Sequence, residues 1–479
     1  MRLKPKNRTH RLNAIASAPD NEKKTIMKMR AVLFTSVLLA VGLIGGLTAR
    51  TSTSEADWPR WRGPFETGMA RGDAPTTWSD SKNIKWKTPI PGRGHSSPVL
   101  WGDQIFVTTA VPIGVEPEGE RPAKPQPGAE SGGRRGAGGG AGPLVDHKFE
   151  LISLDRQTGK VLWQRTARVA TPHEGYHRMY GSFASNSPVT DGKQVFAYFG
   201  SRGIFCYDLK GKLIWEKDLG VRMTMRLSFG EGTAPVLHEN VLVLNIDHEG
   251  EDVMIVLDKN TGKELWRASR DEPSNWAAPL VVEVQGRKQI VVSATRKVRS
   301  YDLKTGAVIW ECAGLGTNTI PAPVRQGDMI YVMSGHREPN LMAIRLDRKG
   351  DLTGTDAVVW TNTRGNAYTA SPVLHDNKLY FVTDSGMVSC LDAKTGKPYY
   401  SQVRLPKATN IKSSPVGANG KLYISTEDGD VVVLKMGETF EVLATNTLEG
   451  QFFIATPAIV DGEIFLRGQN TLFCIQQSR

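Results

Sequence analysis

The chain has 479 residues, of which 39% are hydrophobic and 23% charged, the balance of an ordinary soluble protein. Its formal net charge is +11, but residues 1–30 hold nine basic and two acidic side chains and account for +7 of that charge. The remaining +4 is spread over the rest of the chain, so it lacks the dense basic stripe of a nucleic-acid-binding protein and we expect no nucleic-acid partner.

Residues 1–49 form a basic extension followed by an export signal. The apolar run Ala31–Leu47 contains three glycines and is short for a membrane-spanning helix, and the small residues Thr48 and Ala49 follow it. This pattern predicts an extracytoplasmic protein, periplasmic or secreted. An uncleaved signal is the alternative, and it would be the chain's contact with a membrane.

Residues 50–82 form a leader segment that contains the motif WPRWRGP, Trp58–Pro64. We expect its two indole rings to fasten the leader onto the domain that follows. Because Trp and Arg are frequent anchors of protein interfaces, a partner-docking role is the alternative.

An internal repeat organises residues 83–479. A small-residue pair ending in proline precedes a strand-like run eight times, at Pro98, Pro188, Pro235, Pro279, Pro323, Pro372, Pro415 and Pro457. After Pro188 the spacings are 47, 44, 44, 49, 43 and 42 residues, the period of a four-stranded propeller blade. The first spacing of 90 residues contains residues 111–144, a Gly- and Pro-rich insertion that we expect to be a disordered loop of the first blade.

A second signature ends most repeats: LDRQTGKVLW, YDLKGKLIW, LDKNTGKELW, YDLKTGAVIW and LDAKTGKPYY. It resembles the D-x-x-T-G-x-x-x-W docking motif of the pyrroloquinoline-quinone (PQQ) type propeller repeats, and the chain is similar to the BamB-like exported propellers of bacteria. Tyr400 takes the aromatic position in the sixth repeat and Leu443 in the seventh. The resemblance implies that the tryptophans pack one blade against the next, and these are Trp86, Trp163, Trp215, Trp266, Trp310 and Trp360.

The two chain ends complete each other. The eighth repeat stops at Phe473-Cys474-Ile475 without an outer strand, whereas the strand-like stretch Asn83–Ile90 precedes the first repeat without a partner. We therefore predict an all-β, eight-bladed β-propeller of four-stranded antiparallel blades, PQQ or quinoprotein-like, closed by this N-terminal strand.

Three of the four cysteines, Cys206, Cys390 and Cys474, occupy the same third-strand position, where other repeats have Ser or Val. This position is typical of tight packing, so we expect no disulfides. The motif His173-Glu174-Gly175-Tyr176-His177 matches H-E-x-x-H, but Pro172 and Gly175 place it in a loop and no third ligand is evident. A loop metal site at His173 and His177 therefore stays an alternative to a hydrogen-bonded surface loop.

Residues just before each marker proline enter the inner strand and are expected to ring one mouth of the central channel, where propellers commonly bind ligands. The candidate binding residues are Arg93, His95, Asn186, Glu231, Asn275, Trp276, Asn318, Tyr368, Asn410 and Lys412.

The BamB resemblance implies a non-catalytic binding or scaffold protein, with protein or peptide partners in the cell envelope and a monomeric state. A PQQ-dependent quinoprotein dehydrogenase with calcium is the alternative. The chain has neither a C-x-x-C-H motif nor an adjacent cysteine pair, so we expect no cofactor. A further alternative is a metal-dependent enzyme or carbohydrate-binding propeller centred on His95, His173 and His177.

Overall fold

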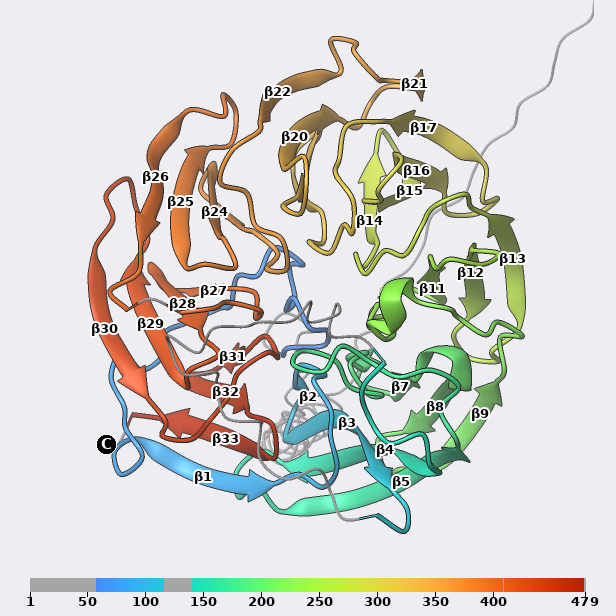
Figure 1. Ribbon diagram of the computed structural model, residues 1–479, viewed down its shortest axis with the longest axis vertical. Coiled ribbons are helices and arrows are strands. Elements are labelled where there is room, and N and C mark those ends of the chain that lie inside the picture. Colours follow the sequence, from blue (N-terminus) through green and yellow to red (C-terminus); the bar gives the residue numbers. More distant parts are fainter. Residues whose placement is uncertain (1–56, 116–139, 408, 478–479) are drawn as a thin grey trace, which may run out of the picture. The chain divides into compact units, whose positions relative to one another are not determined.

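The computed structural model describes residues 57–115, 140–407 and 409–477. The chain divides into two compact units, 1–51 and 52–479, and all described residues belong to the second. In that unit, 33 strands among the described residues form eight sheets arranged as the blades of a ring (Figure 1). The prediction of an all-β, eight-bladed propeller is confirmed. None of the helices in this described part is long and apolar enough to cross a membrane.

Each of the first four blades begins with a short inner strand at a marker proline and ends with an outer strand. The first blade contains β2 (Val99–Trp101), β3 (Gln104–Pro112), β4 (His147–Asp155) and β5 (Val161–Ala170). The second contains β6 (Val189–Thr190), β7 (Gln194–Tyr198), β8 (Ile204–Asp208) and β9 (Leu213–Lys217). The third contains β10 (Val236–His238), β11 (Val241–Ile246), β12 (Val253–Asp258) and β13 (Glu264–Ser269). The fourth contains β14 (Leu280–Val284), β15 (Arg287–Val292), β16 (Val298–Asp302) and β17 (Val308–Cys312).

The remaining blades repeat this order until the last, which borrows its outer strand. The fifth contains β18 (Val324–Gln326), β19 (Met329–Ser334), β20 (Asn340–Arg345) and β22 (Val358–Asn362). The sixth contains β23 (Val373–His375), β24 (Lys378–Val382), β25 (Met387–Asp392) and β26 (Pro398–Arg404). The seventh contains β27 (Val416–Ala418), β28 (Lys421–Ser425), β29 (Asp430–Lys435) and β30 (Val442–Thr447). The eighth contains β31 (Ala458–Val460), β32 (Glu463–Arg467), β33 (Thr471–Gln476) and β1 (Ile84–Pro89).

The ring is closed by β1, the predicted N-terminal strand. It pairs antiparallel with β33, and Trp86 lies opposite Cys474. Lys85 reaches Glu463 at 2.5 Å, and the same carboxylate accepts a hydrogen bond from Arg156 of the first blade at 2.7 Å. Strand pairing and a buried ion-pair cluster therefore join the two ends of the propeller.

The docking tryptophans follow one geometric rule. The indole N–H of Trp163 donates to the carbonyl oxygen of Leu209 at 3.0 Å, one residue after the motif aspartate of the next blade. The ring covers Gly211, where an added Cβ would lie 2.8 Å from it. Trp86, Trp215, Trp266 and Trp360 repeat both contacts on Gly159, Gly262, Gly306 and Gly396. The motif requires glycine for two reasons. The residue has positive φ, which glycine adopts without strain, and the neighbouring tryptophan leaves no room for a side chain.

Trp310 departs from this rule. It is fully buried, and its N–H donates to Gln289 of its own blade at 3.2 Å, while Gln289 donates to the carbonyl of Leu346 in the next blade. A short strand, β21 (Gly350–Asp351), pairs parallel with β17 at this outer edge. The fourth sheet therefore has five strands where four were predicted, because a long loop of the fifth blade folds over it.

The seventh blade corrects a second detail. The prediction that Leu443 takes the aromatic position is wrong, because Ala444 lies opposite Val433, as Trp163 lies opposite Ser153. Leu443 is one residue out of register and is 38% exposed. The prediction that Cys206, Cys390 and Cys474 occupy the same third-strand position is confirmed, since each lies opposite a docking position.

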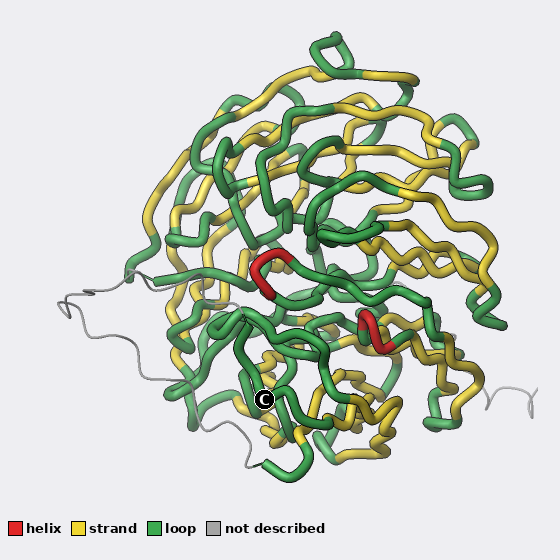
Figure 2. Tube along the Cα trace, turned by 45° about the vertical axis from the view of Figure 1, so that its right-hand side comes forward, coloured by secondary structure: helices red, strands yellow, loops and turns green. Residues whose placement is uncertain are grey.

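The insertion is partly ordered. Val111 and Pro112 belong to β3, and Ala141 forms a bridge with Tyr176. The expectation of a disordered loop over 111–144 is therefore wrong at both edges, because strand pairing continues into them, and residues 116–139 lie outside the described residues. Two 3-10 turns, η1 (Gly200–Arg202) and η2 (Arg226–Ser228), lie in connecting segments and appear red in Figure 2.

The described part of the leader crosses the centre of the ring (Figure 1, blue). Trp58 exchanges backbone hydrogen bonds with Leu100 of the first inner strand, and Pro59 accepts one from Thr190 of the second. The ring of Trp61 packs against Ala234, Ala278 and Ala322, at the inner strands of blades three to five.

The other side of the leader is anchored by Arg62. This side chain is 3% exposed and donates to the carbonyl oxygens of Pro415 and Pro372 at 3.0 and 2.5 Å. Burial lowers the pKa of Arg62 to about 9. Met69 then pairs with Gly417 in the seventh blade, so the leader contacts the inner edges of blades one to seven.

Candidate functional site

A cavity of about 600 Å³ lies on the axis of the propeller. Its walls are the residues that enter the inner strands, and Trp61 of the leader also lines it. In each antiparallel blade, the segment before the inner strand and the loop between the second and third strands lie at the same face. The leader backbone pairs with the inner strands at Leu100, Thr190 and Gly417, and Trp61 packs against residues at the entry of three further inner strands, so the cavity is a cup that the leader closes on one side.

Six predicted rim residues line this cavity: His95, Glu231, Trp276, Asn318, Tyr368 and Lys412. Tyr368 stacks on His336 with ring centroids 4.9 Å apart. The Lys412 ammonium lies 4.4 Å from the centre of the Tyr180 ring and 2.5 Å from Asp384. The structure therefore brings these six residues together from different blades.

Two other predicted residues lie behind the wall. Asn186 is 2% exposed and donates to the carbonyl of Thr233 at 2.8 Å, which links the second and third blades. Asn275 is fully buried and donates to Asp247 and to the carbonyl of Ser293. Neither amide lines the cavity. Successive side chains of an extended segment point to opposite sides, and these two point into the core.

The last two, Arg93 and Asn410, also lie outside the cavity lining. Arg93 donates to the carbonyls of Gly181 and Arg178 at 3.1 and 3.0 Å and lies over the Tyr176 ring. It thereby holds the loop that carries His177, and it lines a second cavity of about 360 Å³. Asn410 donates to Glu427 at 3.4 Å.

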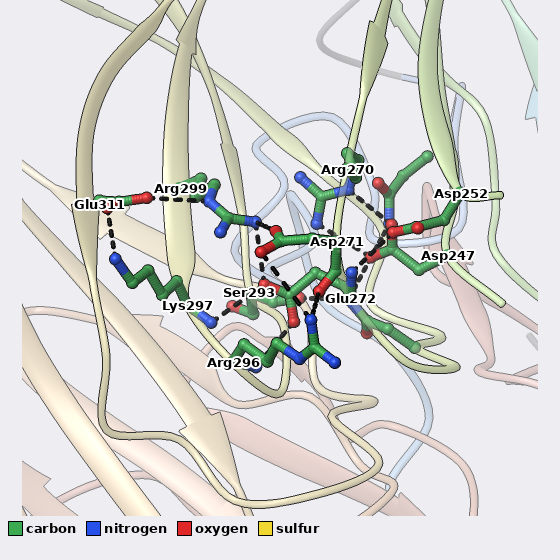
Figure 3. A network of polar contacts seen from close by, with 12 residues as sticks. Asp247, Asp252, Arg270, Asp271, Glu272, Ser293, Arg296, Lys297, Arg299 and Glu311 are labelled. Atoms are coloured by element: carbon green, nitrogen blue, oxygen red, sulfur yellow. Dashed lines mark hydrogen bonds and ion pairs between the residues drawn. The ribbon is translucent and has the colours of Figure 1, made fainter. Parts of the chain in front are cut away.

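A buried polar network fixes one wall of the cup (Figure 3). Arg270 and Asp247 are fully buried and joined by two contacts of 2.5 and 3.0 Å. The same carboxylate accepts from Asn275, whose own oxygen accepts the backbone N–H of Ala277 at 2.9 Å. Trp276, between these residues, donates its indole N–H to the carbonyl of Gly230 at 2.8 Å. The network therefore sets the position of a cavity-lining tryptophan.

The cavity residues that were not predicted include three basic side chains, Arg226, His336 and Arg337. Arg226 begins η2, well before the marker proline, and His336 and Arg337 lie between β19 and β20. Strand order could have found His336 and Arg337, because the loop between the second and third strands returns to the same face as the inner-strand entry. Arg226 lies in the segment between two blades, and no repeat position marks it.

The H-E-x-x-H motif does not form a metal site in the described residues. His173 contacts the carbonyl of Met223 and Arg202, whereas His177 stacks on Tyr180 and lines the cavity. No group of three or more His, Cys, Asp or Glu side chains in the described part of the chain could hold a metal ion. Burial raises the pKa of Glu174 to about 7, although its carboxylate accepts from the backbone N–H of Met225.

The carboxylates near the cup are already paired. Glu231 accepts hydrogen bonds from the backbone and side chain of Ser201, both at 2.7 Å, and from Arg202 at 2.8 Å. Asp384 is paired with Lys412 and also accepts from Thr369 at 2.9 Å. These carboxylates therefore do not offset the positive charge of the other lining residues.

A ring of PQQ-type blades around an axial cup defines a class, the PQQ-like β-propellers. The family model described as "Outer membrane protein assembly factor BamB" matches residues 147–402 and 348–439, more than half of the chain. The chain therefore belongs to this family.

Its relatives include both assembly factors and enzymes. It is 23% identical over 332 residues to a tetrathionate hydrolase of Acidithiobacillus ferrooxidans, covering 66% of this chain and 53% of that protein. It is 23% identical over 197 residues to the outer membrane protein assembly factor BamB of Legionella pneumophila, covering 41% and 46%. The chain thus spans about half the length of these curated relatives.

Among solved structures, a europium-containing methanol dehydrogenase has a TM-score of 0.58 at 11% identity, covering 87% of this chain and 90% of that one. At this identity the likeness shows the fold alone, and it agrees with the eight-bladed ring described above.

Proposed function

We propose that this protein is a binding propeller that holds a small molecule in its axial cup. The observation that carries the proposal is a cavity of about 600 Å³, closed on one side by the leader and lined by Trp61, Phe229 and Trp276. Small-molecule sites typically measure about 300–1,000 Å³ and combine apolar walls with a few polar groups. An extended peptide would need a groove that is open at both ends. Trp61 and Arg62 close one end of this cavity.

The calcium-bound quinone that the family implies does not fit these residues. Calcium takes six to eight oxygen ligands, several of them carboxylates. Glu231 is the carboxylate among the described lining residues, and Ser201 and Arg202 already hold it. The expectation that the protein binds no cofactor stays a prediction.

Gly232 offers a test of the cup. It lines the cavity, and a Cβ there would make only an ordinary contact of 3.4 Å with Trp276. A Gly232→Phe variant should therefore fold and fill the cup. We expect N-phenyl-1-naphthylamine, an uncharged aromatic probe, to bind wild type with raised fluorescence and to raise its unfolding temperature, and to bind Gly232→Phe at least tenfold more weakly. Equal binding to both proteins would overturn the proposal.

A second candidate function is the predicted scaffold role with protein partners in the cell envelope. Its support is the BamB family model and the BamB relative. The signal in residues 1–49 and the extracytoplasmic location belong to this proposal, and residues 1–56 lie outside the described residues. Crosslinking in intact cells, followed by mass spectrometry, should recover a stoichiometric protein partner. A chain that stays monomeric and uncrosslinked there would contradict the scaffold role.

A further inference from the structure

Two arginines enter the cup from separate loops. Arg226 lies on η2 between the second and third blades, and Arg337 lies in the β19–β20 loop of the fifth blade. Within the described residues, neither guanidinium has a hydrogen-bond or ion-pair partner. The backbone at Leu227 and Arg337 has positive φ, 51° and 42°, which the surrounding structure must hold against an unfavourable conformation.

The acidic residues nearby do not balance these two charges. Glu231 is held by Arg202, and Asp384 is held by Lys412 at 2.5 Å. A third cation lies behind the wall: Arg467 is 2% exposed, and its Nε and Nη2 have no partner among the described residues. Burial lowers the pKa of Arg467 to about 9. The cup and its wall therefore carry excess positive charge, with Arg467 buried, Arg226 half-buried and Arg337 exposed at the mouth.

Burial and the positive charge around the cup keep its histidines neutral. The pKa of each of three histidines is lowered, first by burial and then by neighbouring cations. The cations are Arg93 and Arg467 for His95, Lys412 and Arg93 for His177, and Arg337 and Arg226 for His336. Their neutral rings leave the arginines as the main charges of the cup.

The remaining wall is apolar and aromatic. Trp61, Phe229, Trp276 and Ile320 line it, and Tyr368 is stacked on His336. Because the Trp276 N–H is engaged by Gly230, the indole presents carbon surface rather than a free donor. Planar apolar surface beside a guanidinium pair suits a ligand with an apolar or aromatic body and an acidic group.

We infer that the ligand of the cup is an organic anion whose carboxylate, sulfonate or phosphate group binds between Arg226 and Arg337. This inference rests on the proposed function and names its ligand class. A neutral ligand of equal size would make no charge-assisted hydrogen bond with either guanidinium group, and a cationic ligand would be repelled by both.

A matched pair of probes tests the charge. 8-Anilino-1-naphthalenesulfonate carries the same aromatic rings as N-phenyl-1-naphthylamine plus one sulfonate, so the two differ in the anionic group. Fluorescence titration of the full chain should give an affinity for the sulfonate at least tenfold higher than for the neutral amine. The Arg226→Gln and Arg337→Gln variants should each weaken sulfonate binding about tenfold and leave binding of the neutral probe unchanged.

The Arg325→Gln variant is the matched control, because Arg325 lies on β18 outside the cavity lining and donates to the carbonyl of Gly327. It should bind both probes as wild type does. Equal affinity for the two probes, or no effect of Arg226→Gln and Arg337→Gln on the sulfonate, would overturn the anion inference while loss of binding in Gly232→Phe would still support the cup. If Gly232→Phe binds both probes as wild type does, the proposed function itself fails.

Discussion

Buried charges in this propeller are placed where they hold the cup in shape. Asp247 accepts hydrogen bonds from Arg270, Asn245 and Asn275, and all of these side chains are nearly or fully removed from solvent. A buried ion pair costs desolvation energy, so it adds specificity of geometry more than net stability. Here the geometry that it specifies is the position of Trp276, which lies between Asn275 and Ala277, the two residues that Asp247 holds through successive hydrogen bonds.

Breaking this pair should therefore be costly. The Arg270→Met variant leaves Asp247 buried and unpaired, and we expect a loss of about 3–5 kcal/mol of unfolding free energy. Adding Asp247→Asn removes the orphaned charge and should recover part of the loss. Calorimetric unfolding of both variants checks the prediction. A double variant no more stable than Arg270→Met would show that the orphaned charge is not the cause.

Glu174 gives a prediction for pH. Burial raises its pKa from 4.5 to about 7, so the folded state binds this proton more tightly than the unfolded state does. Its contribution to stability is fully present below pH 4.5 and is lost as the pH rises through 7. A Glu174→Gln variant, which cannot ionise, should therefore gain in unfolding temperature relative to wild type between pH 5 and pH 8. A difference between the two proteins that does not change with pH would contradict this assignment.

At the scale of the elements, the repeated glycine and tryptophan form one joint between neighbouring blades. Gly262 and Gly286 both have positive φ, 69° and 75°. A Cβ at Gly262 would lie 2.7 Å from the Trp215 ring, whereas a Cβ at Gly286 would meet nothing within 4 Å. The pair therefore separates the cost of the backbone conformation from the cost of displacing the ring.

Both glycines are suited to substitution by alanine. Gly286→Ala should cost about 1–2 kcal/mol for its left-handed backbone alone. Gly262→Ala should cost about 1–3 kcal/mol more, because the indole must move and lose its hydrogen bond to the Lys259 carbonyl. Unfolding temperatures of the two variants and of Trp215→Ala give the comparison. If the two glycine variants are equally stable, the ring contact contributes nothing.

The elements were predictable from sequence to the extent that they repeat. Marker prolines and D-x-x-T-G turns determine the blades. The missing outer strand of the eighth repeat and the unpaired N-terminal strand together predict the closure by β1. Leu443 was misplaced because the seventh repeat lacks both the motif turn and an aromatic residue to fix its register. Arg226 and Arg337 were missed because they lie in loops of irregular length, and the leader's path across the axis comes from contacts that no repeat encodes.

At the scale of the whole molecule, the ring is closed by non-covalent contacts between its first and last strands. Seven blades are continuous in sequence, and the eighth combines β31–β33 with β1. Glu463 is 2% exposed and binds both Lys85 on β1 and Arg156 in the first blade, so a single carboxylate connects three parts of the closure. Asp461 also pairs with Arg156, at 3.2 Å, but its side chain is largely exposed.

We expect a Glu463→Gln variant to open the ring at this joint first. Removing the buried carboxylate leaves Arg156 with the exposed Asp461 and the carbonyl oxygen of Val460, and should cost about 3 kcal/mol. Because the loss is local, amide hydrogen exchange should accelerate in β1 and β33 while blades three to five keep wild-type protection. The matched Asp461→Asn variant should change exchange little, since its ion pair is solvent-screened. Faster exchange spread evenly over all blades would instead mean that the ring unfolds as one cooperative unit and that the closure is no weaker than any other blade interface.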